Sequence, residues 1–461
     1  MPKGVGKTML HTIEEKKNWY LANFEVFEKD LNGEATSHIH TIRKDAIARF
    51  AEVGFPTTRD EEWKYTDVSP LVRVPFKPVL GRPRDSLTLR EIDQFLVPGR
   101  AKLELNRLVC VNGHFSETLS SMASLPPGVR MGSLAAAMKN DAGLLEHHLA
   151  RYAHYGDNAF TALSTAFLQD GIFISIPDGL IVDAPIHLLF VSTRSDTEFV
   201  SYPRVLIIVG RNCQVSFLES HGSMTDSTYL TNAVAEIVLG ENAVVEYDRI
   251  QNESDRAFHV SSTRIHQARS STFTSNAISL GGALVRNNVT AVLDGEGGEC
   301  TLNGLYMAAG EQHVDNHTAI DHAKPHCASH ELYKGILDGK SRAVFNGKIF
   351  VRKEAQKTDA KQTNKNLVLS DDATIDTKPQ LEIFANDVKC THGATIGQLD
   401  EDAIFYLRSR GIGLDSARDL LIYAFASDII ARVKVDALRE QLERILVRRL
   451  QRTREVKGTK K

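Results

Sequence analysis

The sequence predicts a mainly β protein with helical regions at both ends, and three observations support this fold class. Between Asp170 and Asn386, short apolar or alternating runs are separated by glycine and asparagine turns, a pattern typical of β-strands. Two turn sequences recur within that region. Before Asn158 and after Thr395, apolar residues recur instead at the spacing of a helix.

The composition indicates an ordinary globular protein. The chain has 461 residues, 42% hydrophobic and 25% charged, enough for two or three domains. Its formal charge of -3 predicts no general attraction to nucleic acid or membrane. The five cysteines include no Cys-x-x-Cys pair, which favours a reducing compartment. We recognise neither a signal peptide nor an apolar run of membrane-spanning length, and we expect a cytoplasmic protein.

Helical patterns dominate the first third of the chain. The clearest of them stops at Gly54, because the apolar spacing that includes Phe50 ends there and Pro56 follows. A Thr-Leu-Arg-Glu capping box opens a second, short helix. The expected helices are 42–53, Thr88 to just before Pro98, 134–138 and 144–155.

The run Gly6-Lys7-Thr8 copies the end of a phosphate-binding loop, but the complete motif is absent. That motif requires a glycine five residues before Gly6, where the sequence has Met1, and it also requires a strand leading into the loop. We therefore predict no nucleotide site in this chain.

The β region contains many short strands and loose internal repeats. Such strands fit a β-solenoid, in which each coil stacks its apolar face on the next. A sandwich or a barrel fits the same pattern, so the residues alone leave these architectures open. The first strands are 172–176, 186–191 and 205–209, and the repeats pair 210–215 with 240–245, and 293–295 and 303–304 with 337–339 and 346–347.

Five histidines lie within eighteen residues of the β region. Their spacings of four, five, four and four suit no single element, so we expect solvated histidines on turns, with contact to iron or zinc as the alternative. The group is His313, His317, His322, His326 and His330, with Asp321 and Cys327 among them.

A basic run follows the histidine group. It lacks the interleaved aromatic residues on which nucleic-acid bases stack, so a solvated face or a surface for an acidic partner is the preferred interpretation. The run is Lys348, Arg352, Lys353, Lys357, Lys361 and Lys365.

Helical patterns return after Thr395. Asp400 can cap a helix that ends at Gly411, and Asp415 can cap the next one. Apolar residues form one side of this second helix and a stripe on a third, arginine-rich helix; such a stripe can dock on the protein's own core or on a partner. The side is Leu421, Ala424, Phe425 and Ile429, and the stripe is Leu438, Leu442, Ile445, Leu446 and Leu450.

The best candidate site lies between the β region and these helices. Cys390 and His392 stand two residues apart after an alternating run, so in an extended chain both side chains project from one face. A thiol and an imidazole on one face can bind a soft metal or handle sulfur. The structural alternative is a small buried thiol beside a hydrogen-bonded histidine, which is the commoner arrangement in strands.

The segment from Leu381 to Thr395, followed by 405–411, resembles the C-terminal signature of the SufB/SufD family, the scaffold subunits of an iron–sulfur cluster assembly machine. The resemblance implies a right-handed parallel β-helix and so decides between the architectures. It also implies an N-terminal mainly helical domain, a β-helix core and a C-terminal helical domain, over 1–165, 166–395 and 396–461. Further stretches that resemble the family are 54–58, 62–66, 159–163 and 358–364.

Within this family the chain is more similar to SufD than to SufB. SufB-like chains carry a cysteine in the strand that here spans 360–369, and this chain has none there. Lys389 to Gly393 instead resembles the SufD pattern. The resemblance implies that His392, together with Cys390, holds a transient iron–sulfur cluster at the interface with a SufB-like partner. It implies a non-catalytic scaffold that a cysteine desulfurase system serves indirectly.

The resemblance also implies that the C-terminal helices bind a SufC-like ABC ATPase, so we assign part of their apolar surface to that partner. Neither a nucleic acid nor a membrane is expected as a partner. The predicted contact residues are Phe405, Leu407, Arg408, Arg410, Leu421 and Phe425.

Three other interpretations stay open. A SufB-like scaffold is disfavoured by the missing cysteine. A carbohydrate-active β-helix protein would need paired carboxylates on a groove and an export signal. A metalloenzyme built on the histidine group would hold metal tightly and in stoichiometric amount.

Overall fold

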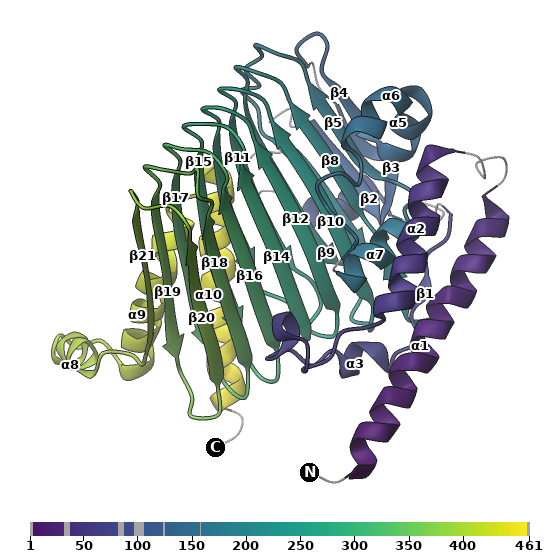
Figure 1. Cartoon of the computed structure of the whole chain (residues 1–461). Helices are drawn as coiled ribbons and strands as arrows, with labels where there is room; N and C mark the ends of the chain where they lie inside the picture. The colour runs from purple at the N-terminus through teal and green to yellow at the C-terminus, as the bar shows by residue number, and fades with distance from the viewer. Residues whose placement is uncertain are drawn as a thin grey trace.

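The protein is a β-solenoid with helices packed against its outside (Figure 1). This architecture confirms the predicted mainly β fold class and excludes the sandwich and the barrel. The computed structural model describes residues 3–31, 37–81, 87–95, 106–122, 125–156 and 158–458, with the backbone alone for 3–13, 93 and 452–458.

Two long sheets form the solenoid, and each coil adds one strand to each of them. Strand β10, for example, pairs in parallel with β8 on one edge and with β12 on the other. In the part of the chain that the structure describes, sheet A has eleven strands. They are β1 (Lys77–Pro78), β4 (Arg130–Ser133), β5 (Gly171–Ile176), β7 (Phe199–Ser201), β8 (Arg204–Val209), β10 (Leu230–Leu239), β12 (Phe258–Gln267), β14 (Leu284–Leu293), β16 (His313–His322), β18 (Arg342–Val351) and β20 (Thr374–Ile383).

Sheet B lies opposite sheet A across the interior of the solenoid. It runs in the order β21-β19-β17-β15-β13-β11-β9-β6-β2-β3, so that β21 is its last strand. Its strands are β2 (Asn106–Val111), β3 (His114–Ser121), β6 (Ile186–Ser192), β9 (Gln214–Ser223), β11 (Val244–Asn252), β13 (Thr272–Ser279), β15 (Glu299–Ala308), β17 (Ala328–Leu337), β19 (Asp359–Val368) and β21 (Lys389–Gly397).

Turn asparagines stack from coil to coil at one corner. Val209 pairs with Leu239 one coil later, so Asn212 and Asn242 occupy equivalent positions. Both have positive φ (54° and 57°), a conformation that asparagine adopts more readily than most residues. Nδ2 of Asn242 donates to Oδ1 of Asn212 at 2.9 Å. The first predicted repeat therefore corresponds to one coil.

The second predicted repeat does not correspond to a coil. Leu293 ends β14 in sheet A, whereas Leu337 ends β17 in sheet B, and the two strands are not register neighbours. The two stretches have similar sequences because strand ends in both sheets need the same turn residues.

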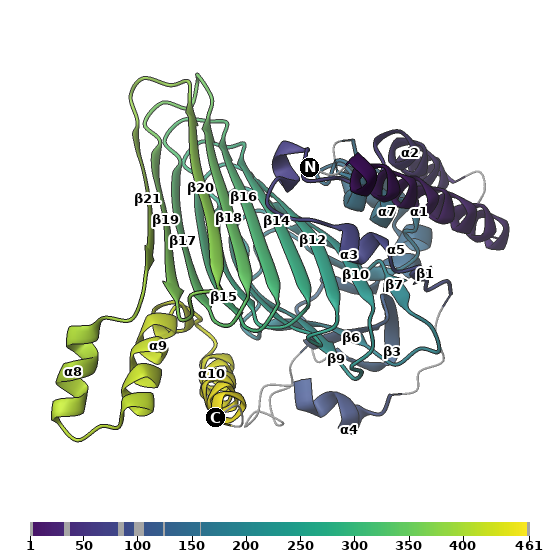
Figure 2. The same cartoon turned by 90° about the horizontal axis from the view of Figure 1, so that it is seen from below.

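Helices cover two opposite faces of the solenoid, with α1, α2 and α7 on one and α9 and α10 on the other (Figure 2). The predicted helix end at Gly54 and the Thr88–Glu91 capping box are both present, whereas Pro98 lies outside the described residues. The helices are α1 (Lys3–Asp30), α2 (His38–Val53), η1 (Glu61–Trp63), α3 (Ser69–Val72), α4 (Leu89–Ile92), η2 (Asp93–Phe95), α5 (Leu134–Asn140), α6 (Ala142–His148), α7 (Ala159–Ala166), α8 (Glu401–Ser409), α9 (Leu414–Ile430) and α10 (Asp436–Gly458).

Two predictions for the N-terminal region need correction. Strands β2, β3 and β4 were not anticipated, and they extend both sheets of the solenoid into a region that reads as mainly helical. The helix expected over 144–155 ends at His148, where turns follow. The rejection of a phosphate-binding loop at Gly6, Lys7 and Thr8 agrees with the structure, because these residues lie within α1.

Two predictions for the C-terminal helices also need correction. Gly413, not Asp415, is the N-cap of α9; Asp415 lies in the first turn, where a negative charge still favours the helix dipole. Of the predicted side of α9, Ile429 is buried, but the rest of the packed side is formed by Ile422 and Ala426 and not by Leu421 and Phe425. The side chains of Leu421 and Phe425 are therefore only half-buried.

The apolar stripe of α10 docks on the protein itself. Leu438, Leu442, Leu446 and Leu450 are buried against the outer face of sheet B, which supplies Ile250 and Ile278 among others. Self-docking of this stripe replaces the expectation that a partner covers it.

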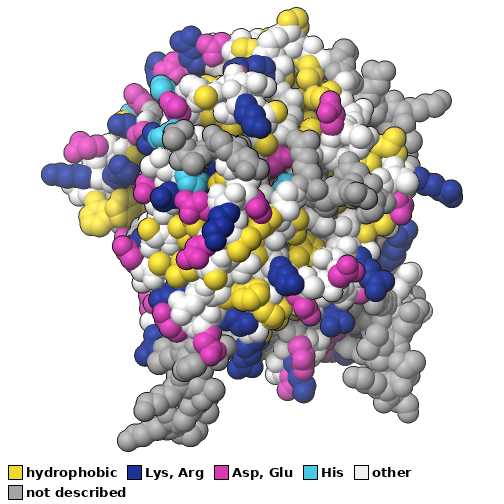
Figure 3. Space-filling view, turned by 90° about the vertical axis from the view of Figure 1, so that its right-hand side faces the viewer, with side chains coloured by type: hydrophobic (Ala, Val, Ile, Leu, Met, Phe, Trp, Pro, Cys, Tyr) yellow, Lys and Arg dark blue, Asp and Glu magenta, His cyan; other side chains and the backbone are white. Residues whose placement is uncertain are grey.

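Charged side chains of both signs are interspersed on the face of the molecule shown in Figure 3. Several members of the predicted basic run form exposed ion pairs, including Arg352 with Asp321 and Lys357 with Asp387. The interpretation of this run as a solvated face is consistent with these pairs. Among the residues that the structure describes, no helix has the length and apolar character needed to cross a membrane.

Candidate functional site

Cys390 and His392 lie at the open end of the solenoid, on β21. Their register partners on β19 are Ala360 and Gln362, which are fully buried in the interior. Because side chains on paired parallel strands point the same way, Cys390 and His392 face the end of that interior. The predicted placement of both side chains on one strand face is therefore correct.

The two side chains differ in burial. Cys390 is half-buried against Leu381 and Val388, whereas His392 is exposed. Burial raises the pKa of the Cys390 thiol, and a hydrogen bond from the Ala360 backbone lowers it only in part. The thiol form is thus favoured at neutral pH, and a nearby cation would be needed to stabilise the thiolate.

The last coil exposes apolar side chains that earlier coils bury. Ile396 is 55% exposed, although its register partner Asn366 in the preceding coil is buried. Ile383 and Phe384 at the end of β20 are exposed as well. Within the described residues, β20 and β21 each pair on one edge only. An unpaired strand edge with exposed apolar side chains is a template for another chain.

A buried polar layer lies directly behind His392. Gln362 is the register partner of His392 on one side and of Glu331, on β17, on the other. Nε2 of Gln362 donates to Oε2 of Glu331 at 2.7 Å. Across the interior, Gly347 faces Gln362; a Cβ there would lie 2.3 Å from Nε2 of Gln362. Sequence reasoning missed this layer because only the coil register brings Glu331 and Gln362 together.

Burial raises the pKa of Glu331 to about 7, and the hydrogen bond from Gln362 together with the nearby Thr318 hydroxyl offsets this only in part. The folded pKa thus lies above its ordinary value of 4.5. The stability that this group contributes is fully present below pH 4.5 and is lost as the pH rises through about 7.

We expect Glu331→Gln, an isosteric and always neutral replacement, to remove this loss. Relative to the variant, the wild type should lose roughly 3 kcal/mol between pH 4.5 and pH 8, the equivalent of the difference between the two pKa values. Chemical denaturation of both proteins at several pH values measures this difference. Parallel pH curves for the two proteins would contradict the prediction.

The predicted partner-binding residues on the C-terminal helices are partly accessible. On α8, Phe405 is 74% exposed, Arg408 is exposed and Leu407 is half-buried. Arg410, the C-cap residue of α8, is exposed as well. A cavity of about 550 Å³ separates α8 to α10 from the last coils and is lined by Ile404 among others. The half-buried Phe425 lies on α9, where Lys334 Nζ sits 4.3 Å from its ring centroid.

The histidine group is carried mainly by strands, which corrects the expectation of turns. On β16, His313 and His317 face outward and hold the N-terminal segment through Thr66 and Glu62, at 2.9 and 3.2 Å. His322 faces inward, and burial lowers its pKa to about 4. Spacing by four places two side chains on one face of a strand, and the odd offset of His322 places it on the other. Of the remaining two, His326 lies exposed on a turn and His330 is exposed on β17.

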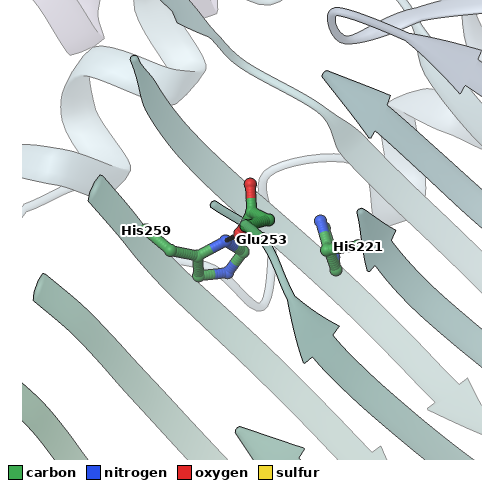
Figure 4. A group of neighbouring side chains, drawn as sticks. All are labelled: His221, Glu253 and His259. Atoms are coloured by element: carbon green, nitrogen blue, oxygen red, sulfur yellow. Dashed lines mark hydrogen bonds and ion pairs between the residues drawn. The ribbon is translucent and has the colours of Figure 1, made fainter. Parts of the chain in front are cut away.

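A second histidine group, not anticipated from the sequence, lies inside the solenoid: His221, Glu253 and His259 (Figure 4). Among the described residues it is the one group whose potential ligand atoms all lie within 4.8 Å of one another. His259 is already engaged through both ring nitrogens: Nδ1 bonds Glu253 at 2.6 Å and Nε2 accepts from Arg249 at 2.6 Å. His221 bonds Glu219 through Nε2, and its buried Nδ1 has no hydrogen-bond partner. A metal would have to displace the guanidinium of Arg249, so we interpret this group as structural.

Comparison with known proteins finds two matching family models. The model described as SUF system FeS cluster assembly, SufBD core domain, matches residues 190–425. The model of the SufBD protein N-terminal region matches residues 14–188. Together they span most of the solenoid and of the helical N-terminal region.

Three relatives are similar over most of their length. An iron-sulfur cluster assembly SufBD family protein of Synechocystis is 36% identical, covering 89% of this chain and 91% of the relative. Iron-sulfur cluster assembly protein SufD of Escherichia coli is 32% identical, with 86% and 89% covered. The chloroplastic protein ABCI7 of Arabidopsis thaliana is 30% identical, with 90% and 88% covered.

Proposed function

Because the chain belongs to the SufB/SufD family of iron–sulfur cluster assembly proteins, we propose that it is a SufD-like scaffold subunit that pairs with a SufB-like subunit and binds a SufC-like ATPase. The similarity to a relative named SufD supports the finer assignment. The missing cysteine on β19 also supports SufD over SufB, and family membership replaces the carbohydrate-active alternative.

The observation that carries this proposal is the open end of the solenoid. Strands β20 and β21 offer unpaired edges, and Ile383 and Ile396 are exposed beside them. A SufB-like solenoid that adds its own end strands would bury these side chains and satisfy the edge N–H and C=O groups. We propose this end as the SufB interface.

His392 and Cys390 would lie inside that interface, where they can hold the nascent cluster. The cluster is the cargo of the assembly and not a resident group of the chain. An imidazole can ligate cluster iron, and thiolates are the usual cluster ligands. Because this chain contributes one thiol there, the partner would supply further soft ligands. We propose that the chain has no catalytic activity of its own.

The C-terminal helices would receive the ATPase. Phe405 on α8 projects into solvent, with the exposed Arg408 and Arg410 on the same short segment. Exposed aromatic and arginine side chains are the residues most enriched at interface centres. Nucleotide hydrolysis would then move the two scaffolds as rigid bodies. We also propose a cytoplasmic location, which the five unpaired cysteines support.

We expect two exposed-residue variants to separate the two interfaces. Phe405→Asp should lose the SufC-like partner and keep the SufB-like one, while Ile396→Asp should do the reverse. Each should weaken its own contact at least tenfold, because a central apolar contact is replaced by a desolvated charge. The measurement is affinity purification of the full chain co-expressed with both partners.

Val26→Asp is the matched control, because Val26 is 53% exposed on α1, far from both surfaces. It should retain both partners. Purification of the unaltered chain without either partner would refute the scaffold proposal. Truncating the chain after Gly411 would not test the ATPase interface alone. It removes α9 and α10, whose apolar sides are buried on sheet B.

A further inference from the structure

Gln362 lies on the strand between the exposed His392 and a carboxyl in the interior. It is the register partner of both His392 and Glu331, and its amide nitrogen donates to the Glu331 carboxyl at 2.7 Å. The amide oxygen of Gln362 and Oε1 of Glu331 are buried and have no hydrogen-bond partner. One acceptor therefore remains available on each of the two side chains behind the open end.

The surroundings of Glu331 are built to hold a neutral acid. Thr318 faces the carboxyl from β16, and Gly347 on β18 leaves the space that Gln362 fills. The titratable groups near it are Cys300 on β15 and Tyr333 on β17, and burial raises the pKa of both, so that both stay uncharged at neutral pH. None of these neighbours supplies a positive charge to Glu331.

A cation bound at the open end would favour the ionised form of Glu331 over the neutral acid. Glu331 and His392 are two strands apart, roughly 10 Å between backbones. At an effective dielectric constant of about 20, a unit negative charge at that distance strengthens binding of a divalent cation by roughly two orders of magnitude. An imidazole that binds metal through one ring nitrogen usually donates its other N–H to an acceptor that fixes its tautomer. The amide oxygen of Gln362, which has no partner and lies on the neighbouring strand, would serve as such an acceptor when His392 binds a metal.

We propose that Glu331, acting through Gln362, is a positioning residue that prepares His392 for a divalent cation of the Fe²⁺ class and compensates the charge of that cation. This inference rests on the proposed function, in which His392 holds cluster iron. On cation uptake, the carboxylic acid of Glu331 becomes a carboxylate and its proton passes to solvent. No electron is transferred.

The test titrates the purified full chain with Co²⁺, a visible-absorbing stand-in for Fe²⁺, in weak buffer containing a pH indicator. At pH 6, Glu331→Gln should release one proton fewer per bound Co²⁺ than the wild type. At pH 8 it should release the same number and bind Co²⁺ roughly a hundredfold more weakly. Glu331→Asp, which keeps the carboxyl, should restore part of the affinity. Far-ultraviolet circular dichroism checks that each variant is folded.

Two further variants make the outcomes distinguishable. His392→Ala should lose Co²⁺ binding, and Thr391→Ala, on the other strand face, should not. This inference would be overturned if Glu331→Gln and the wild type released the same number of protons and bound Co²⁺ equally well, while His392→Ala bound none. The proposed function would then still stand. Unchanged Co²⁺ binding in His392→Ala would refute the metal site itself, and the inference with it.

Discussion

Replacing His392 by alanine is expected to abolish iron–sulfur cluster assembly in cells that depend on this chain, while the protein stays folded. The side chain is exposed at the end of β21. Its removal creates no cavity and should alter the free energy of unfolding by no more than about 0.5 kcal/mol. Its loss removes the one imidazole that faces the open end from β21. The measurement is the activity of a cluster-dependent dehydratase in cell extract, which should fall to the level without the chain.

Two neighbouring variants sharpen this result. Thr391→Ala changes an exposed side chain on the opposite strand face and should leave activity normal. Cys390→Ala should have a milder effect than His392→Ala, because burial holds its thiol protonated in the free chain. Partner retention by the His392→Ala chain shows that assembly of the complex is unaffected. Normal dehydratase activity in that variant would disprove the site assignment.

The fold could be predicted from the sequence where the same turn residues recur in successive coils. Gly210 and Gly240 each follow an apolar strand, and the asparagines after them adopt the same left-handed conformation. Strands β2 to β4 were not predictable, because neighbours from later in the chain, such as β5 and β6, complete their sheets. Long-range pairing of this kind overrides the local pattern of a segment.

The candidate site was predictable only in its exposed layer. Alternation along β21 places Cys390 and His392 on one face without knowledge of any other strand. Glu331 and Gln362 are 31 residues apart in sequence, and the coil register is what brings them into contact. The group of His221, Glu253 and His259 was not predictable either, because it combines a strand of sheet B, a strand of sheet A and the residue that follows β11.

The interior of this solenoid is held by charge as well as by apolar packing. Arg249 is buried and donates to Glu219 at 2.9 Å and to Asn287 at 2.8 Å. Burial raises the pKa of Glu219, but His221 and Arg249 more than offset this, so the carboxyl stays ionised. A carboxylate can stay ionised in the interior only while a cation pairs with it.

Arg249→Met is therefore expected to destabilise the protein by about 3–5 kcal/mol, the usual cost of leaving a buried charge unpaired. The replacement keeps most of the side-chain volume, so a cavity adds little to this value. Chemical denaturation of the full chain, compared through the midpoints of wild type and variant, measures the loss. The double variant Arg249→Met with Glu219→Gln should recover part of it, because the uncompensated charge is gone.

Arg211 supplies the matched control, since it pairs with Asp178 at a similar distance of 2.8 Å, but both side chains are exposed. Arg211→Met should cost far less than Arg249→Met, because water screens a surface pair. The contrast separates burial from ion pairing as the source of the effect. Equal losses of unfolding free energy in the two arginine variants would mean that the Arg249 network contributes no more than a surface salt bridge. Metal analysis of His221, Glu253 and His259 would then be the next measurement.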